Sequence, residues 1–209
     1  MRKLVVALLV LVALFAAADF AARGYAESRA GRTLQSSLGL SKEPTVSLAG
    51  FPFLFHLASG DFSSITLTDH DFMVKGVAIR RATVTLRDVS FTPSALLSSN
   101  GGDIHVGRGE GTAVLTADAV TAIFREQGVP VRVRFAAGKA VLTSSKLPGR
   151  IEGSLTVSGT ELVVHATAAG LSYSLPLPTL VPGISYTGVR IDGDAALLSF
   201  EVTQRTIRV

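Results

Sequence analysis

The 209-residue sequence contains no cysteine, and this absence removes several kinds of chemistry at once. Without thiols the chain has no disulfides, no thiolate metal site and no cysteine nucleophile. A protein of this length can bury a sizeable core, so it does not depend on cross-links to fold. The stability of the fold must therefore come from the burial of apolar side chains.

Charged residues are also scarce, at 17% of the sequence, whereas hydrophobic residues make up 47%. Such a composition is too apolar for a disordered chain. The formal net charge is +4, and it falls to +2 (4 − 2) if Arg2 and Lys3 leave with an N-terminal signal. Because the basic residues are not clustered, we expect no nucleic-acid partner. A mild positive charge instead suits an anionic membrane surface.

Motifs for catalysis are missing as well. There is no Gly-x-Ser-x-Gly elbow, no His-Glu-x-x-His and no phosphate-binding loop. The glycine-rich segment 107–111 precedes a strand pattern instead of a helix, so we interpret it as a flexible or bulged strand. Asp69, His70 and Asp71 are metal-capable, but on one strand only the two aspartates would share a face. We therefore expect no enzyme activity, no metal and no cofactor.

An apolar run at the N-terminus is the first positive feature. A short basic start precedes an uninterrupted apolar stretch over residues 4–18, which ends in three alanines. This order is typical of a secretory signal. The run is shorter than the ~20 residues that cross a bilayer, although extension to residue 22, past Asp19, would give an uncleaved anchor. Residues 1–18 are interpreted as a signal peptide or anchor, which places the protein in the periplasm or cell envelope.

The rest of the chain divides at a change of periodicity near residues 40–45. Residues 19–40 have apolar positions at helical spacing and are predicted to form an N-terminal helix. Asp19 is the expected N-cap of this helix, because its carboxylate can accept hydrogen bonds from first-turn amides. Residues 41–209 follow a pattern of period two with glycine and proline turns, and they are predicted to form one α+β domain.

Strands follow strands in this domain, without the alternation of strand and helix that a parallel sheet needs. Short helices are predicted over residues 94–98 and after Asp118, which is the expected N-cap of the second helix. A hairpin is predicted at Asp192–Gly193. A change in the parity of apolar positions near Arg80–Arg81 indicates a bulge, and bulged strands curve a sheet. The predicted fold is α+β, with one long, curved, mainly antiparallel sheet wrapped around a few helices.

A phenylalanine-rich segment at residues 49–62 interrupts the strand pattern. Four of the eleven phenylalanines lie here, and Pro52 and Gly60 are placed to begin and end a short helix. Apolar residues cover nearly the whole circumference of this helix, whereas a surface helix has one polar face. The helix must plug a core, line an apolar cavity or touch a membrane, and the residues alone leave these three open.

A curved sheet closed by this helix would give the concave, sparsely polar shape of sites for apolar ligands. The predicted lipid lining combines residues in or beside the helix with three later phenylalanines: Phe51, Phe53, Leu54, Phe55, Leu57, Phe62, Phe72, Phe124 and Phe135. Basic residues near strand ends are candidates for contact with a phosphate head group. These are Lys75, Arg80, Arg81, Arg132 and Arg134.

The order of these features resembles the LmeA-like envelope proteins of actinobacteria. The most specific part is Gly-Phe-Pro-Phe-Leu at residues 50–54, with residues 44–49 before it, residues 59–62 after it and residues 182–191 near the C-terminus. The resemblance implies a fold of the kind found in tubular lipid-binding proteins. It also implies phospholipid binding and support of lipomannan and lipoarabinomannan elongation.

Three functional hypotheses follow. The first is a non-catalytic, phospholipid-binding protein of the cell envelope that supports lipoglycan elongation, with phospholipid and the membrane surface as partners. The second is a scaffold that docks on an envelope glycosyltransferase, such as a mannosyltransferase, through the proline-rich segment 175–183. The third is a hydrolase or transferase acting on a lipid-linked sugar, with Asp69, His70 or Asp71 as acid or base.

Overall fold

The computed structural model describes residues 2–74, 76–92, 103–144, 149–166, 170–177 and 183–208. The fold is α+β with antiparallel sheets, which confirms the predicted class. The strands divide between two sheets, so the prediction of one long sheet is wrong in this respect. The helix predicted over residues 94–98 lies outside the described residues.

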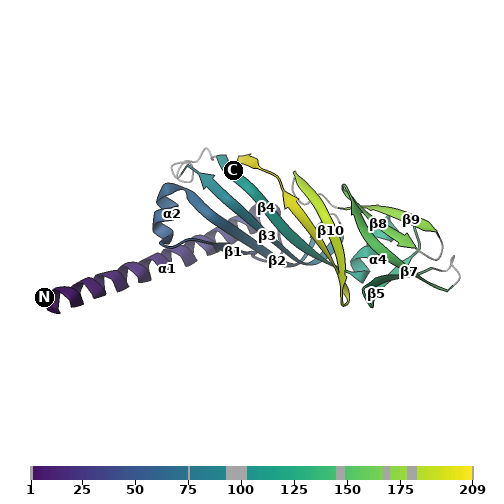
Figure 1. The fold of residues 1–209 in the computed structure, drawn as a ribbon, viewed down its shortest axis with the longest axis horizontal. Helices are drawn as coiled ribbons and strands as arrows, with labels where there is room; N and C mark the ends of the chain where they lie inside the picture. The colour runs from purple at the N-terminus through teal and green to yellow at the C-terminus, as the bar shows by residue number, and fades with distance from the viewer. Residues whose placement is uncertain are drawn as a thin grey trace. The chain divides into compact units, whose positions relative to one another are not determined.

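The first sheet has seven strands (Figure 1). They are β1 (Thr45–Leu48), β2 (Asp61–Val74), β3 (Val77–Phe91), β4 (Asp103–Thr116), β10 (Ile184–Asp192), β11 (Ala195–Val202) and β12 (Arg205–Arg208). Their order is β1-β2-β3-β4-β11-β10, and β12 also pairs with β4. The predicted hairpin is confirmed, because β10 and β11 pair from Asp192↔Ala195 onward.

The second sheet has five strands in the order of the sequence. They are β5 (Arg132–Ala136), β6 (Lys139–Thr143), β7 (Arg150–Ser158), β8 (Glu161–Ala166) and β9 (Leu171–Pro176). The sequence does not predict β9, because three prolines within residues 175–183 disfavour ladder pairing and indicate a loop there. Pro176 is the last residue of β9, at the edge of the sheet, where a proline removes no ladder hydrogen bond.

Three helices are described: α1 (Arg2–Leu38), α2 (Phe53–Ser59) and α4 (Ala117–Glu126). α2 begins after Pro52 and ends at Gly60, whose φ of 78° is left-handed, so the helix predicted from this proline and glycine is confirmed. α1 runs through Asp19 without interruption, so the prediction that Asp19 caps a separate helix is wrong. The boundary proposed after residue 18 therefore lies inside one continuous helix.

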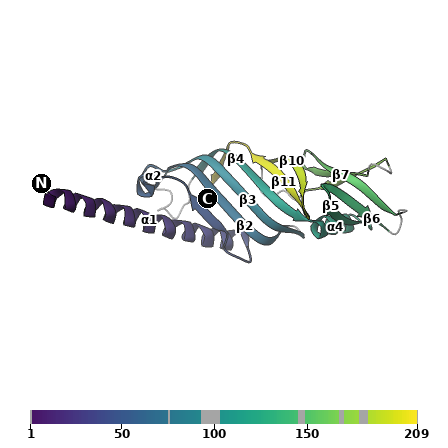
Figure 2. The same ribbon diagram turned by 60° about the horizontal axis from the view of Figure 1, so that its bottom comes forward.

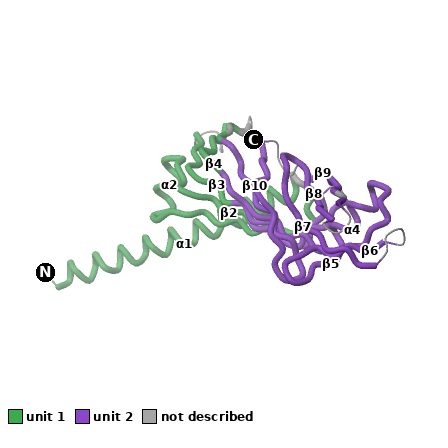
Figure 3. Tube along the Cα trace, turned by 45° about the vertical axis from the view of Figure 1, so that its right-hand side comes forward, with its two compact units in different colours: residues 1–67, 85–108, 204–209 green, residues 68–84, 109–203 purple. Residues whose placement is uncertain are grey.

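The chain forms two compact units, which are described separately (Figure 3). Unit 1 contains Met1–Leu67, Thr85–Arg108 and Gln204–Val209, and unit 2 contains Thr68–Val84 and Gly109–Thr203. The long strands β2, β3 and β4, which lie side by side in Figures 1 and 2, contribute residues to both units.

Unit 2 has an extensive core in which α4 packs against β5. Val120, Ile123 and Phe124 form the buried face of α4. On β5 the buried Val133 alternates with the exposed Arg132 and Arg134, as the sequence predicts for a strand with one face on a core. The N-cap of α4 is Thr116, whose hydroxyl accepts the amide N–H of Ala119 at 3.1 Å, and not Asp118 as expected.

Two details of the long strands follow from packing. The exposed Arg80 and Arg81 are consecutive on β3, which agrees with the predicted change of parity there. Gly111 on β4 faces the ring of Phe200, and a Cβ at this position would collide with that ring and with the carbonyl of Thr83. The glycine in the middle of β4 is therefore required by the core of unit 2.

Candidate functional site

The N-terminal part of α1 has no strand beside it in Figures 1 and 2. Its large apolar side chains are exposed, from 75% for Leu4 to 53% for Phe15. Among the described residues, α1 is the one helix long and apolar enough to cross a membrane. Membrane-spanning helices and signal sequences have similar length and composition. This segment is therefore consistent with both a signal peptide and an uncleaved anchor.

Asp19 joins α1 to α2. Asp19 is only 1% exposed. Its two carboxylate oxygens accept the backbone N–H groups of Phe53 and Leu54, each at 2.8 Å. First-turn amides have no partner within a helix, and the N-terminal end of a helix favours negative charge. Asp19 therefore caps α2 and not its own helix, although α2 is distant from Asp19 in the sequence.

A second carboxylate ties β1 to α1. Glu27 Oε1 accepts the backbone N–H of Leu48 at 2.8 Å and the Nε–H of Arg23 at 3.0 Å. Both contacts lie in unit 1 and are partly buried. The start of the first sheet and α2 are thus both fixed to the second half of α1.

The four phenylalanines of the segment at residues 49–62 differ in burial. Phe53 and Phe62 are 1% and 3% exposed, with ring centroids 5.9 Å apart. Phe51 and Phe55 are 63% and 70% exposed. The segment therefore plugs the core with one pair of rings and presents the other pair outward. Contact of any of these rings with lipid stays a prediction.

The hydrophobic cluster of unit 1 around α2 is small. Among the described residues it contains three buried hydrophobic residues, Phe53, Phe62 and Val89, and two further residues of unit 1, Val46 and Val106, are buried outside this cluster. A larger set of hydrophobic residues packs around these three and is only partly buried: Ala22, Ala26, Leu48, Leu54, Leu57, Ile65, Leu86, Phe91 and Ile104. In a filled core most such residues are almost fully buried. Much of the clustered apolar surface of unit 1 is therefore still accessible.

The strands of unit 1 show the same partial exposure. Residues 64–67 of β2 are all half-buried, whereas a sheet with one covered face alternates between buried and exposed side chains. The hydroxyls of Thr66 and Thr85 lie 3.4 Å apart on one face of β2 and β3. Ile65 and Leu67 point to the other face. We refer to Leu67 and the partly buried set around the unit 1 core as the apolar rim.

The other three predicted lining residues belong to unit 2. Phe124 is fully buried, and its ring lies 6.0 Å from that of Tyr173 in an edge-on arrangement. Phe72 and Phe135 are partly buried and pack against the same core. Their packing explains why these positions are aromatic. A role in lipid contact is not needed to account for them and stays a prediction.

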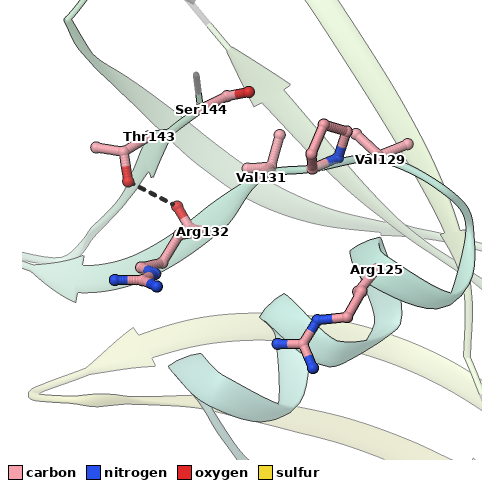
Figure 4. A pocket seen from close by; sticks show the side chains of 7 residues that line it. Arg125, Val129, Val131, Arg132, Thr143 and Ser144 are labelled. Carbon is pink, nitrogen blue, oxygen red and sulfur yellow. Dashed lines mark hydrogen bonds between the residues drawn. The ribbon is translucent and has the colours of Figure 1, made fainter. Parts of the chain in front are cut away.

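An open pocket of about 480 Å³ lies in unit 2. It is lined by Arg125, Val129, Pro130, Val131, Arg132, Thr143 and Ser144. Arg125 comes from the last turn of α4 and Arg132 from β5, and Figure 4 shows these two elements facing each other. The Thr143 hydroxyl donates to the Arg132 carbonyl at 3.3 Å. Guanidinium groups beside hydroxyls suit a phosphate or carboxylate.

The remaining head-group candidates have different surroundings. Arg80 forms a bidentate ion pair with Asp194, at 2.9 and 3.3 Å. This hydrogen-bonded guanidinium lowers the pKa of Asp194 below its usual value. Arg81 Nε donates to the ring of His70 at 3.3 Å, Arg134 is exposed, and Lys75 lies outside the described residues. Of the predicted set, Arg132 is the one that lines the pocket, and the fold adds Arg125.

The acidic segment at residues 69–71 has local partners. Asp69 Oδ1 accepts the amide N–H of His70 at 2.8 Å. Within the described ranges, no group of three or more His, Cys, Asp or Glu side chains is arranged to hold a metal ion. A catalytic role of one of these residues as acid or base, the third hypothesis, stays a prediction.

The described part of the proline-rich segment also has a structural role. Leu175 and Leu177 are 2% and 5% exposed and belong to the core of unit 2. These two side chains are therefore not available to a docking partner. The rest of the segment, residues 178–182, lies outside the described residues.

Comparison with known proteins identifies a family. A sequence model of the LmeA-like phospholipid-binding family matches residues 17–203 of the chain. The match begins within α1, just before Asp19, and extends through β11. The searches of curated proteins and of solved structures returned no match.

Proposed function

Because the chain belongs to the LmeA-like phospholipid-binding family, we propose that it binds phospholipid in the cell envelope without catalysing a reaction. The acyl chains would lie on the apolar rim of unit 1. The observation that carries this proposal is the half-exposure of Ile65 and Leu86, which pack against the cluster of Phe53, Phe62 and Val89. Leu67 is also half-buried and lies two residues from Ile65 on the same face of β2. Covering apolar surface stabilises a complex by about 25 cal/mol per Å².

Attachment to a membrane fits the same proposal. Arg2 and Lys3 precede the exposed apolar part of α1, and basic residues favour the cytoplasmic side of a membrane. Unit 2, and the part of unit 1 that follows the apolar segment of α1, would then lie on the outer side. If the segment before Asp19 is removed, the carboxylate of Asp19 remains available to cap α2.

A role in the elongation of lipomannan and lipoarabinomannan is the biological context suggested by the family resemblance. A protein that holds phospholipid at the outer face of the membrane would act beside the glycosyltransferases that extend these lipoglycans. Replacing the wild-type gene by a variant defective in phospholipid binding should then shorten the lipoglycans, as seen by gel electrophoresis. Lipoglycans of normal length would show that phospholipid binding by this protein is not needed for lipoglycan elongation.

The proposed function is tested with Leu67→Asn and the matched variant Ser64→Asn on the same strand. Ser64 and Leu67 are both half-buried but face opposite sides of β2. Burial of a leucine side chain contributes about 1.5–3 kcal/mol, so Leu67→Asn should reduce affinity for phospholipid by about tenfold or more. Ser64→Asn should bind like the wild type. The measurement is the bound phospholipid seen by native mass spectrometry of the full chain.

Two outcomes would contradict the proposal at different levels. A wild-type protein that carries no phospholipid, and takes none from vesicles, would remove phospholipid binding itself. A folded Leu67→Asn variant with wild-type occupancy would leave the function in place but move the acyl chains away from the rim.

A further inference from the structure

Three exposed phenylalanines lie on or near the junction of α1 and α2, where Asp19 of α1 binds the first amides of α2. Phe20, on α1, is 62% exposed, and its ring lies 6.2 Å from the ring of Phe51, which is 63% exposed. Phe55, in the first turn of α2, is 70% exposed. We refer to Phe20, Phe51 and Phe55 as the exposed phenylalanines. Large apolar groups gathered on a surface usually mark a site of interaction.

The length of α1 gives the depth of these rings relative to a bilayer. A helix rises 1.5 Å per residue, so a hydrocarbon core of ~30 Å takes about 20 residues. Counted from Leu4, that length ends at Arg23, which is the first charged residue after Lys3 apart from the buried Asp19. Phe20 then lies within one helical turn of the outer boundary. The ring of Phe51 lies within 6.2 Å of the ring of Phe20 and so close to the same boundary.

Asp19 would oppose this placement if its charge were free, because a carboxylate is costly within a membrane. However, Asp19 is 1% exposed, and both of its oxygens accept backbone N–H groups of α2. These bonds also satisfy first-turn amides, which are costly to bury without partners. The carboxylate of Asp19 and the first amides of α2 therefore satisfy each other's hydrogen bonds. The junction of α1 and α2 can thus enter the boundary of the bilayer without an unpaired polar group.

We propose that the segment at residues 50–59 inserts into the outer leaflet of the phospholipid bilayer that α1 crosses, with the exposed phenylalanines among the head groups and upper acyl chains. Apolar and aromatic faces of interfacial helices are buried to this depth in membranes. The inference rests on the proposed function and deepens it. Leu54 and Leu57, on α2, belong to the apolar rim, so insertion brings the rim into contact with acyl chains of the leaflet.

The absence of tryptophan from the sequence makes a direct test available. Phe55→Trp places a single fluorophore on α2, and Met73→Trp places one on β2 of unit 2, at a side chain that is similarly exposed, 68% against 70%. Both changes replace exposed side chains, so neither should disturb the fold. The full chain is reconstituted into phosphatidylcholine–phosphatidylglycerol vesicles, with and without lipids brominated along the acyl chain, and phospholipid occupancy is measured in parallel.

We expect Phe55→Trp to emit at shorter wavelength than Met73→Trp and to be quenched most by bromines near the head-group end of the chain. Met73→Trp should be quenched little. Equal, weak quenching of the two variants, in a protein that still carries phospholipid, would overturn the insertion of α2 and leave the proposed function intact. Strong quenching at Phe55→Trp in a protein that takes up no phospholipid would support insertion and contradict the proposed function.

Discussion

The carboxylate of Asp19 accepts the backbone N–H of Phe53 at 2.8 Å, and this bond joins two helices that are far apart in the sequence. Phe53 in turn is one of the three buried residues of the cluster around α2. Leu54, the next residue, belongs to the apolar rim, and Phe51, two residues earlier, is one of the exposed phenylalanines. The carboxylate of Asp19, which also accepts the N–H of Leu54, therefore helps to position both features.

Removal of the Asp19 carboxylate should destabilise unit 1. Asp19→Ala leaves two amides of α2 without an acceptor, and an unsatisfied buried group costs about 1–3 kcal/mol. Asp19→Asn keeps one acceptor oxygen and should lose less. The free energy of unfolding of the full chain in detergent micelles, measured with guanidinium chloride and circular dichroism, gives these values.

Asp118→Ala is the matched control for Asp19→Ala. Asp118 is an exposed acidic residue in the first turn of α4, where the N-cap is Thr116. Its removal should change the free energy of unfolding by no more than about 1 kcal/mol. Equal losses for Asp19→Ala and Asp118→Ala would show that the carboxylate of Asp19 does not fasten α2.

The pocket of unit 2 should prefer an anionic ligand. Replacing Arg125 and Arg132 together by glutamine removes two guanidinium donors from its lining. Hydrogen bonds to charged groups contribute about 1.5–3 kcal/mol, and exposure to water and salt reduces this, so we expect about a fivefold to tenfold loss of affinity for phosphatidylglycerol. Binding of phosphatidylglycerol dispersed in micelles, measured at two salt concentrations, checks the loss.

Arg134→Gln is the control for the pocket, because Arg134 lies two residues further along β5 and does not line it. This variant should retain nearly wild-type affinity. If Arg134→Gln weakened binding as much as the double variant, the effect would come from net charge and not from the pocket.

Stability at high pH should depend on Tyr186. Burial raises the pKa of this phenol from 10.0 to about 12, because desolvation disfavours the phenolate. The folded state thus holds the proton more tightly than the unfolded state. This contribution to stability is fully present below pH 10 and is lost as the pH rises from 10 to about 12.

Tyr186→Phe isolates this effect, since the ring packs edge-on against Phe200 at 6.2 Å and phenylalanine keeps that contact. Unfolding of the variant should depend less on pH between 10 and 12 than unfolding of the wild type. Identical pH profiles for the two proteins over this range would contradict a buried neutral phenol at this position.

Much of the local structure could be predicted from the sequence. Pro52 and Gly60 fixed the ends of α2, and the alternation at Arg132–Val133–Arg134 identified β5 with its buried and exposed faces. These signals work because each depends on neighbouring residues alone. The same is true of the turn at Asp192–Gly193, which joins β10 and β11.

Features that depend on distant residues could not be predicted. An aspartate before an apolar segment has the pattern of an N-cap whether it caps its own helix or another one, so Asp19 was assigned to the wrong helix. Arg125 has no sequence signal that distinguishes it from other surface arginines, and only the packing of α4 against β5 places it near Arg132. Likewise, the different burial of Phe51 and Phe53 follows from the tertiary fold.

The central claim is that acyl chains of phospholipid lie on the apolar rim of unit 1, and photo-crosslinking tests it most directly. The full chain is loaded with a phosphatidylcholine that carries a diazirine in its acyl chain, irradiated and mapped by peptide mass spectrometry. The account predicts adducts at Ile65, Leu67 and Leu86, which are all half-exposed; Ile65 and Leu86 pack against the cluster of Phe53, Phe62 and Val89. Adducts confined to unit 2, with none on these three residues in a protein that carries the lipid, would contradict it.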